Sequence, residues 1–215
     1  MDPYFKYIDI PNLSTIQQQV YQHYVDIMNE KPPVPGDRTD YAKTTVDDAT
    51  SPRAPTVNNF SLILVKTESV YRYSPALEEY LHSVNLKCEL NRIVLITTSG
   101  NTTATLHSDG FYCANSINLP IYNCENGYTE FFEDDDKMYE PIGDYRRVEN
   151  APSEVVATAS ANRPQWFNNF KIHRAINKSP NPRYTMSLRF DPPKYIQPRR
   201  GPWVSELHAR TKIID

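Results

Sequence analysis

Apolar and polar positions follow two different periods along this chain. Near the amino terminus, four apolar residues are spaced by four, four and three positions, which predicts one buried helical face: Ile16, Val20, Tyr24 and Ile27. Ser14 with Gln17 three positions later has the form of a capping box, so the helix is expected to begin at Ser14. The prolines after Lys31 end it.

The stretch between this helix and the first β-like run shows neither period. Residues 31–59 are rich in Pro, Asp and Thr and are expected to form a long loop of the kind that often serves as a lid. Phe60–Val65 is a short apolar run typical of a strand. Ser74 followed by Pro75 predicts a second helix, with Leu77, Tyr80 and Leu81 on its buried face.

Beyond about residue 90 the pattern is that of short strands separated by turns. The expected strands are 92–97, 102–107, 114–122, 128–133, 154–158, 170–176 and 183–190. This number of short strands favours a mostly β jelly roll, that is, a double-stranded β-helix, with flanking amino-terminal helices. We expect one domain, 1–215, with helices, loop and a supporting strand in 1–90, the jelly-roll core in 91–191 and an extended tail in 192–215.

Composition narrows the functional classes. With 39% hydrophobic residues the chain has enough apolar surface for a packed core, and a net charge of −3 gives no basic field for nucleic acid. No apolar stretch reaches the length of about 18 residues that spans a bilayer, and the first ten residues lack a signal pattern. The three cysteines have no metal-type spacing. We therefore expect a soluble cytoplasmic protein with reduced thiols.

Three residues form a candidate metal site. His107 and Asp109 are two positions apart, so on an extended segment both side chains point to one face. His173 lies 66 positions after His107 (173 − 107), a separation that a rolled double sheet would close. Two imidazoles and one carboxylate suit Fe(II) and leave coordination positions open for an organic co-substrate and dioxygen.

An arginine strand follows the second histidine. Arg183 lies ten positions after His173 (183 − 173), across a proline-containing turn, and is expected to begin the neighbouring strand. A guanidinium there can hold a carboxylate through two parallel hydrogen bonds. Strand alternation places four residues on the same face of this strand: Arg183, Thr185, Ser187 and Arg189.

This order of residues resembles the Fe(II)- and 2-oxoglutarate-dependent oxygenases over about residues 93–190. The segment Asn118-Leu-Pro-Ile-Tyr122 is similar to a strand motif of that family, and Arg183-Tyr-Thr185 is similar to its Arg-x-Ser/Thr pair. The resemblance implies that His107, Asp109 and His173 bind iron and that Arg183, Thr185, Asn118 and Arg189 bind 2-oxoglutarate. It also implies hydroxylation of a substrate by dioxygen, with release of succinate and carbon dioxide.

Two other readings of the same residues remain open. The first is a non-catalytic binding or structural module of the same fold, for example in a virus particle or another assembly, since small members of the family occur in bacteria and their phages. The second is a cupin-like barrel with another metal. The substrate is not encoded in these motifs; an amino-acid side chain, a peptide or a small molecule is favoured over nucleic acid.

Overall fold

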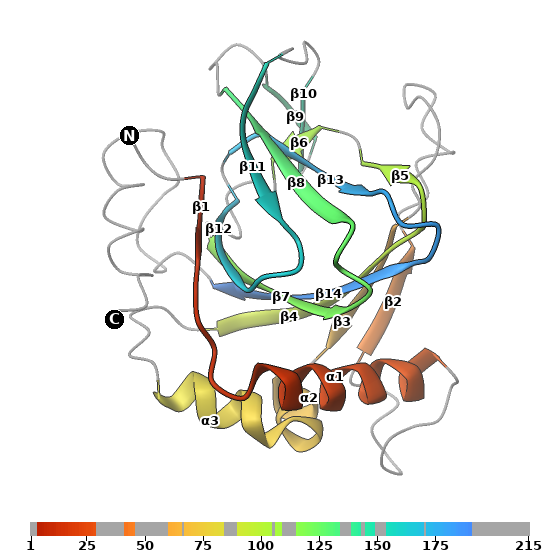
Figure 1. The fold of residues 1–215 in the computed structure, drawn as a ribbon, viewed down its shortest axis with the longest axis vertical. Coiled ribbons are helices and arrows are strands. Elements are labelled where there is room, and N and C mark those ends of the chain that lie inside the picture. Colours follow the sequence, from red (N-terminus) through yellow and green to blue (C-terminus); the bar gives the residue numbers. More distant parts are fainter. Residues whose placement is uncertain are drawn as a thin grey trace.

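Two β-sheets face one another, and helices cover the outer side of one of them (Figure 1). The structure is a computed structural model that describes residues 4–28, 41–45, 60–65, 67–83, 90–104, 106–108, 115–133, 139–142, 145–148, 154–169 and 171–190. Asp109, residues 134–138 and the expected tail at 192–215 lie outside the described residues. The mostly β class expected from the sequence is confirmed.

The first sheet is antiparallel and has its longest strands at the centre. Its order is β1 (Phe5–Tyr7), β12 (Gln165–Asn168), β7 (Asn115–Tyr122), β14 (Arg183–Phe190), β4 (Leu90–Thr98), β3 (Phe60–Val65) and β2 (Tyr41–Thr45). The strand that carries the arginines, β14, therefore lies between β7 and β4. Both its edges are paired, which fixes its register.

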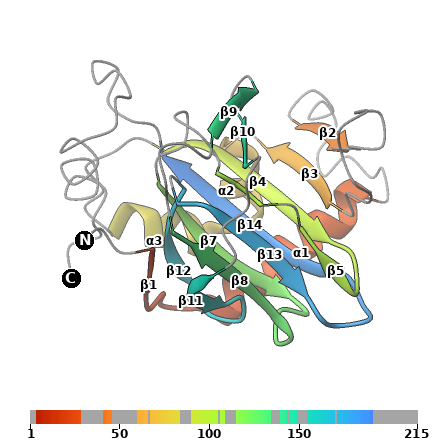
Figure 2. The same cartoon turned by 90° about the horizontal axis from the view of Figure 1, so that it is seen from above.

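The second sheet carries the candidate histidines. Its order is β11 (Val155–Ser160), β8 (Gly127–Phe132), β13 (His173–Asn177), β6 (His107–Ser108), β10 (Tyr145–Val148) and β9 (Tyr139–Ile142), and β5 (Thr102–Thr103) also pairs with β13. From β6 onward the chain passes repeatedly between the two sheets, which produces a double-stranded β-helix. Figure 2 shows that the long strands of both sheets run along nearly the same direction.

Three helices cover the outer face of the first sheet in the described part of the chain: α1 (Leu13–Met28), α2 (Thr67–Tyr73) and α3 (Pro75–Ser83). Three of the four residues predicted on the apolar face of α1 are buried, since Ile16, Val20 and Tyr24 are at most 5% exposed, while the side chain of Ile27 is not among those described. They pack with Met186 and Leu188 of β14, each 0% exposed. Each such side chain contributes about 1.5–3 kcal/mol through burial. None of the described helices is long and apolar enough to cross a membrane.

Several boundaries differ from the sequence expectation. Helix α1 begins at Leu13, so Ser14 lies within its first turn and is not the cap. Ser74 does cap α3, because its Oγ accepts a hydrogen bond from the Leu77 backbone N–H at 3.3 Å. The expected loop at 31–59 contains strand β2, which pairs with β3. Short strands β1, β9, β10 and β12 were also not expected, since such strands carry too few residues to show a period.

Candidate metal and co-substrate site

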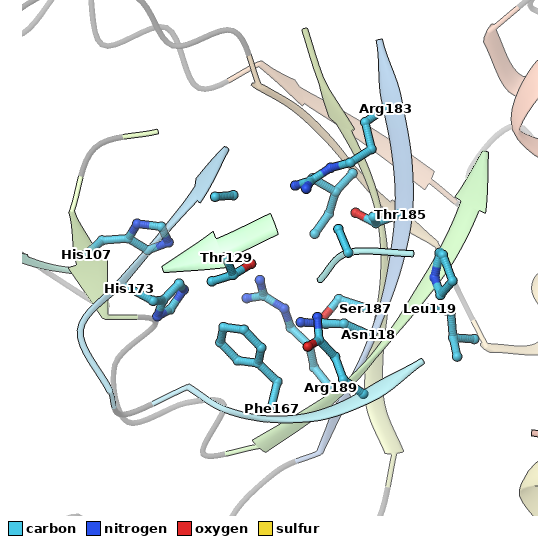
Figure 3. A pocket seen from close by; sticks show the side chains of 15 residues that line it. His107, Asn118, Leu119, Thr129, Phe167, His173, Arg183, Thr185, Ser187 and Arg189 are labelled. Atoms are coloured by element: carbon cyan, nitrogen blue, oxygen red, sulfur yellow. The ribbon is translucent and has the colours of Figure 1, made fainter. Parts of the chain in front are cut away.

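A cavity of about 100 Å³ lies between the two sheets. Figure 3 shows imidazoles on one side of it and the polar side chains of β14 on the other. Its lining residues come from both sheets: Ile96, His107, Asn118, Leu119, Pro120, Thr129, Ala161, Gln165, Phe167, His173, Ala175, Arg183, Thr185, Ser187 and Arg189. Every described residue of the predicted site lies on this wall, including residues that are far apart in the sequence.

The two candidate histidines are direct neighbours across the second sheet. His107 of β6 is paired in register with His173 of β13, and their ring centroids are 4.4 Å apart at an angle of 57°. Residues opposite one another on antiparallel strands point to the same face, so both imidazoles face the cavity. Phe167 packs edge-on against His173 at 4.8 Å, which shields the ring from water.

A backbone contact orients the ring of His173. Its Nδ1 lies 2.7 Å from the carbonyl oxygen of Lys171, and because a carbonyl can only accept, Nδ1 carries the proton. In the neutral ring, Nε2 is then the nitrogen with the lone pair. Metal-binding histidines are commonly held in this way, with one nitrogen donating to a backbone carbonyl and the other on the metal.

These features fit a site with an Fe(II) donor set. The buried, oriented imidazole of His173 and the half-buried imidazole of His107 would supply two nitrogen ligands. The sequence places the third ligand at Asp109, which lies outside the described residues. Among the residues that are described, no three His, Cys, Asp or Glu side chains are grouped closely enough to hold a metal ion. The histidine pair is therefore the part of the expected triad that the structure places.

The other described histidines take no part in this cavity. His23 is 1% exposed and stacks on Tyr73 at 3.9 Å between α1 and α2. His82 is exposed near the end of α3. His23 is therefore a packing residue and His82 a surface residue, while His208 lies outside the described residues.

Arg183 is a buried cation without a described carboxylate beside it. Only 4% of the residue is exposed. Its Nη1 donates to the Ile176 carbonyl at 3.3 Å and its Nη2 to Thr98 Oγ1 at 3.4 Å, while Nε has no hydrogen-bond partner among the described residues. Burial lowers the pKa of the guanidinium. An isolated buried charge is costly, so this site favours an anionic ligand that offsets it.

The rest of β14 alternates as the sequence predicts. Thr185, Ser187 and Arg189 line the cavity, whereas Met186 and Leu188 between them pack toward the helices. Ser187 lies in register with Asn118 of β7, which in turn lies in register with Gln165 of β12. A row of three polar side chains thus crosses the first sheet along the cavity wall. Figure 3 shows Arg189 reaching from β14 toward the histidine side.

Gln165 and Thr98 were missed by the sequence analysis. Gln165 is 4% exposed, and its Oε1 has no hydrogen-bond partner among the described residues. Its strand, β12, is only four residues long, so no alternation was available to place it. Thr98 lies one residue beyond the predicted strand 92–97 and ends the observed strand β4, and it faces Arg183 because β4 pairs with β14. Phe167 both packs against Phe131 and lines the cavity.

Asn177 fixes the turn that joins the histidine strand to the arginine strand. Its Nδ2 lies within hydrogen-bond distance of the carbonyl oxygens of Thr98, Ser99 and Asn181, at 3.2, 3.0 and 2.9 Å. Its Oδ1 accepts from the Ser179 backbone N–H at 3.1 Å. One buried amide therefore ties both ends of the turn to β4, and with them the start of β14.

The substitution Asn177→Ala is expected to lower the free energy of unfolding by about 2–4 kcal/mol, because it leaves several buried backbone groups without a partner. It should also weaken anion binding at Arg183, whose strand begins at the end of this turn. Chemical denaturation measures the first effect. Asn162→Ala is the control: it removes an exposed amide whose Oδ1 accepts a hydrogen bond from nearby Ser160, and it should change stability by less than about 0.5 kcal/mol. Equal losses in both variants would contradict the role of Asn177.

Cys124 is a buried, free thiol next to this site. Its Sγ lies 3.2 Å from the Tyr184 carbonyl oxygen and 3.4 Å from that of Tyr122. Burial raises the pKa of the thiol, and the nearby Arg183 opposes part of that rise. The thiol is therefore protonated at neutral pH and unreactive. This agrees with the reduced cysteines expected from the sequence; Cys88 and Cys113 lie outside the described residues.

Comparison with known proteins shows likeness in structure alone. No family model matches the chain, and no curated protein matches its sequence. The epimerase SnoN, solved with Fe3+, alpha ketoglutarate and nogalamycin RO, superposes with a TM-score of 0.53 at 12% identity, covering 87% of this chain and 78% of SnoN. A prolyl hydroxylase from Trichoplax adhaerens, solved with a hypoxia inducible factor peptide fragment, gives 0.50 at 11% identity, covering 87% and 83%.

AviO1 from Streptomyces viridochromogenes Tue57 gives a TM-score of 0.50 at 10% identity and covers 90% of this chain and 91% of its own. SnoN is described as a non-heme alpha ketoglutarate dependent epimerase. The chain has the fold of the iron- and 2-oxoglutarate-dependent oxygenases. Within that oxygenase fold, the resemblance expected from His107, His173 and Arg183 is confirmed at the level of architecture.

Proposed function

We propose that this protein is an Fe(II)- and 2-oxoglutarate-dependent dioxygenase. The observation that carries the proposal is Arg183: a guanidinium that is 4% exposed, lines the cavity between the sheets and has no described carboxylate beside it. A buried cation of this kind favours a ligand that brings its own carboxylate. The paired imidazoles of His107 and His173 line the same cavity, so a single dicarboxylate co-substrate would be held between arginine and metal.

Each residue of the site has a proposed role. His107, Asp109 and His173 would hold the iron, which supplies the oxidising chemistry when bound. Arg183 and Thr185 would hold the far carboxylate of 2-oxoglutarate, and Asn118 and Arg189 would contact the co-substrate along the wall of the first sheet. Phe167 packs against His173 and keeps bulk water from the metal ligands.

The proposed reaction consumes one 2-oxoglutarate and one dioxygen. The co-substrate loses carbon dioxide and takes up one oxygen atom as succinate, and the second oxygen atom is inserted into a C–H bond of the substrate to give an alcohol. The similar structures include an epimerase as well as a hydroxylase, so hydroxylation is proposed here on the site residues rather than on fold. An amino-acid side chain, a peptide or a small molecule is the proposed substrate class.

The test is anaerobic titration of the purified protein with Fe(II) and 2-oxoglutarate. A visible charge-transfer band is expected, because the co-substrate would bind the metal directly, and Zn(II) in place of Fe(II) should give none. On admission of oxygen, succinate should form even without the prime substrate. If iron binds without the band and without succinate, the protein is a binding module of the same fold instead.

A further inference from the structure

We infer that Gly127, the first residue of β8, sets the depth of the anion site by leaving room for Arg183. This inference rests on the proposed function and extends it to co-substrate chain length. Gly127 is buried on the opposite sheet from Arg183, at the point where the arginine side chain crosses between the sheets. Its role would be that of a positioning residue.

The space that Gly127 leaves is filled by the arginine itself. A Cβ built on Gly127 would lie 2.5 Å from Nη1 and 2.7 Å from Cδ of Arg183, and 3.2 Å from the Cβ of Ala161. Real Cβ atoms essentially never show contacts below about 3 Å to other heavy atoms. Any side chain at position 127 is therefore incompatible with the present place of the guanidinium, and a small residue at 161 completes the niche.

Nothing in the backbone of Gly127 demands glycine. Its φ does not lie in the left-handed region, so an alanine there is conformationally allowed. Its N–H donates to the Cys124 carbonyl at 3.1 Å and its carbonyl accepts from the Ala161 N–H at 2.9 Å, and alanine would keep both bonds. Steric room for Arg183 is the remaining reason for a glycine at this position.

The direction in which Arg183 would move follows from its surroundings. The two atoms in conflict belong to a flexible side chain, so the arginine shifts more readily than the strand. On other sides the guanidinium contacts Thr98 and the Ile176 carbonyl. The empty space next to it is the cavity. An added methyl group would thus push the guanidinium toward the histidines and shorten the gap that a dicarboxylate must span.

Gly127→Ala should therefore shift preference from the five-carbon 2-oxoglutarate toward the four-carbon oxaloacetate. With Mn(II)-loaded protein in calorimetric titrations, we expect 2-oxoglutarate to bind at least about tenfold more weakly, because contacts to a charged group are lost. The ratio of the two affinities should move toward oxaloacetate, and Mn(II) affinity should not change. Asn126→Ala, at the exposed neighbouring position, is the control.

The outcomes separate this inference from the proposed function. If wild-type protein binds neither dicarboxylate, the proposed function fails. If wild-type protein binds 2-oxoglutarate and a folded Gly127→Ala variant binds it equally well, or loses both dicarboxylates to the same extent, only the inference about chain length is overturned. Ala161→Val narrows the same niche from its other wall and should shift the preference in the same direction, which keeps the test available if Gly127→Ala does not fold.

Discussion

Arg183→Met is expected to have opposite effects on stability and on ligand binding. Without ligand, the variant should be more stable than the wild type by about 1–3 kcal/mol, because it removes a buried charged group whose hydrogen bonds are incomplete. Affinity for 2-oxoglutarate should fall by about 30-fold to several thousand-fold, the range found when one partner of a buried charge pair is truncated. Methionine fills much of the same volume, so the loss reports the charge rather than a cavity.

Thermal unfolding with and without 2-oxoglutarate, in the presence of Mn(II), measures both effects at once. The wild type should be stabilised by the co-substrate, since a ligand that binds only the folded state raises its stability. The variant should begin higher and gain nothing. Arg174→Met is the matched control, because Arg174 is partly exposed and already paired with Glu130 at 2.7 Å. A destabilised Arg183→Met protein that still responds to 2-oxoglutarate would contradict the assignment of Arg183.

His173→Ala is expected to abolish the Fe(II) and 2-oxoglutarate charge-transfer band. Removing groups that only support a metal ligand costs about 10–100-fold in metal affinity, so loss of the ligand itself should cost at least as much. Folding should be less affected, because the ring contacts of His173 with Phe167 and Phe131 make up only part of that core.

Equilibrium titration of Fe(II) under anaerobic conditions measures the change in affinity, and circular dichroism checks that the fold is kept. His82→Ala, at an exposed position on α3, should titrate like the wild type. Unchanged iron affinity in a folded His173→Ala protein would remove this residue from the site and, with it, the interpretation of the paired imidazoles as ligands.

The alternation of β14 was predictable because it depends on local geometry. In an eight-residue strand the side chains change face at each step, so one known cavity residue places the others. The same reasoning explains the α1 face, where the helical period alone identified Ile16, Val20 and Tyr24. In both elements the periodic pattern covers enough residues to be distinguished from a chance arrangement.

Pairing between distant strands was not predictable in the same way. That His107 lies opposite His173, and Gln165 opposite Asn118, is set by how the sheets close rather than by any neighbouring residue. Strand β9 contains Pro141 and lies at the edge of its sheet. Proline is tolerated in an edge strand, although it argues against a central one. In the sequence, Gly127 could not be distinguished from a turn glycine, because the side chain that requires a glycine there is Arg183 on the other sheet.

In the turn between β13 and β14, the number of residues matters more for the site than the type of residue at each position. A deletion of one residue there would shift β14 by one position and exchange its two faces. Met186 and Leu188 would then meet the paired histidines, and both arginines would point into the apolar layer under the helices. Substitutions between residues 178 and 182 can change the affinity of the site by degrees, whereas an insertion or deletion of one residue would turn the same strand from a binding wall into a hydrophobic one.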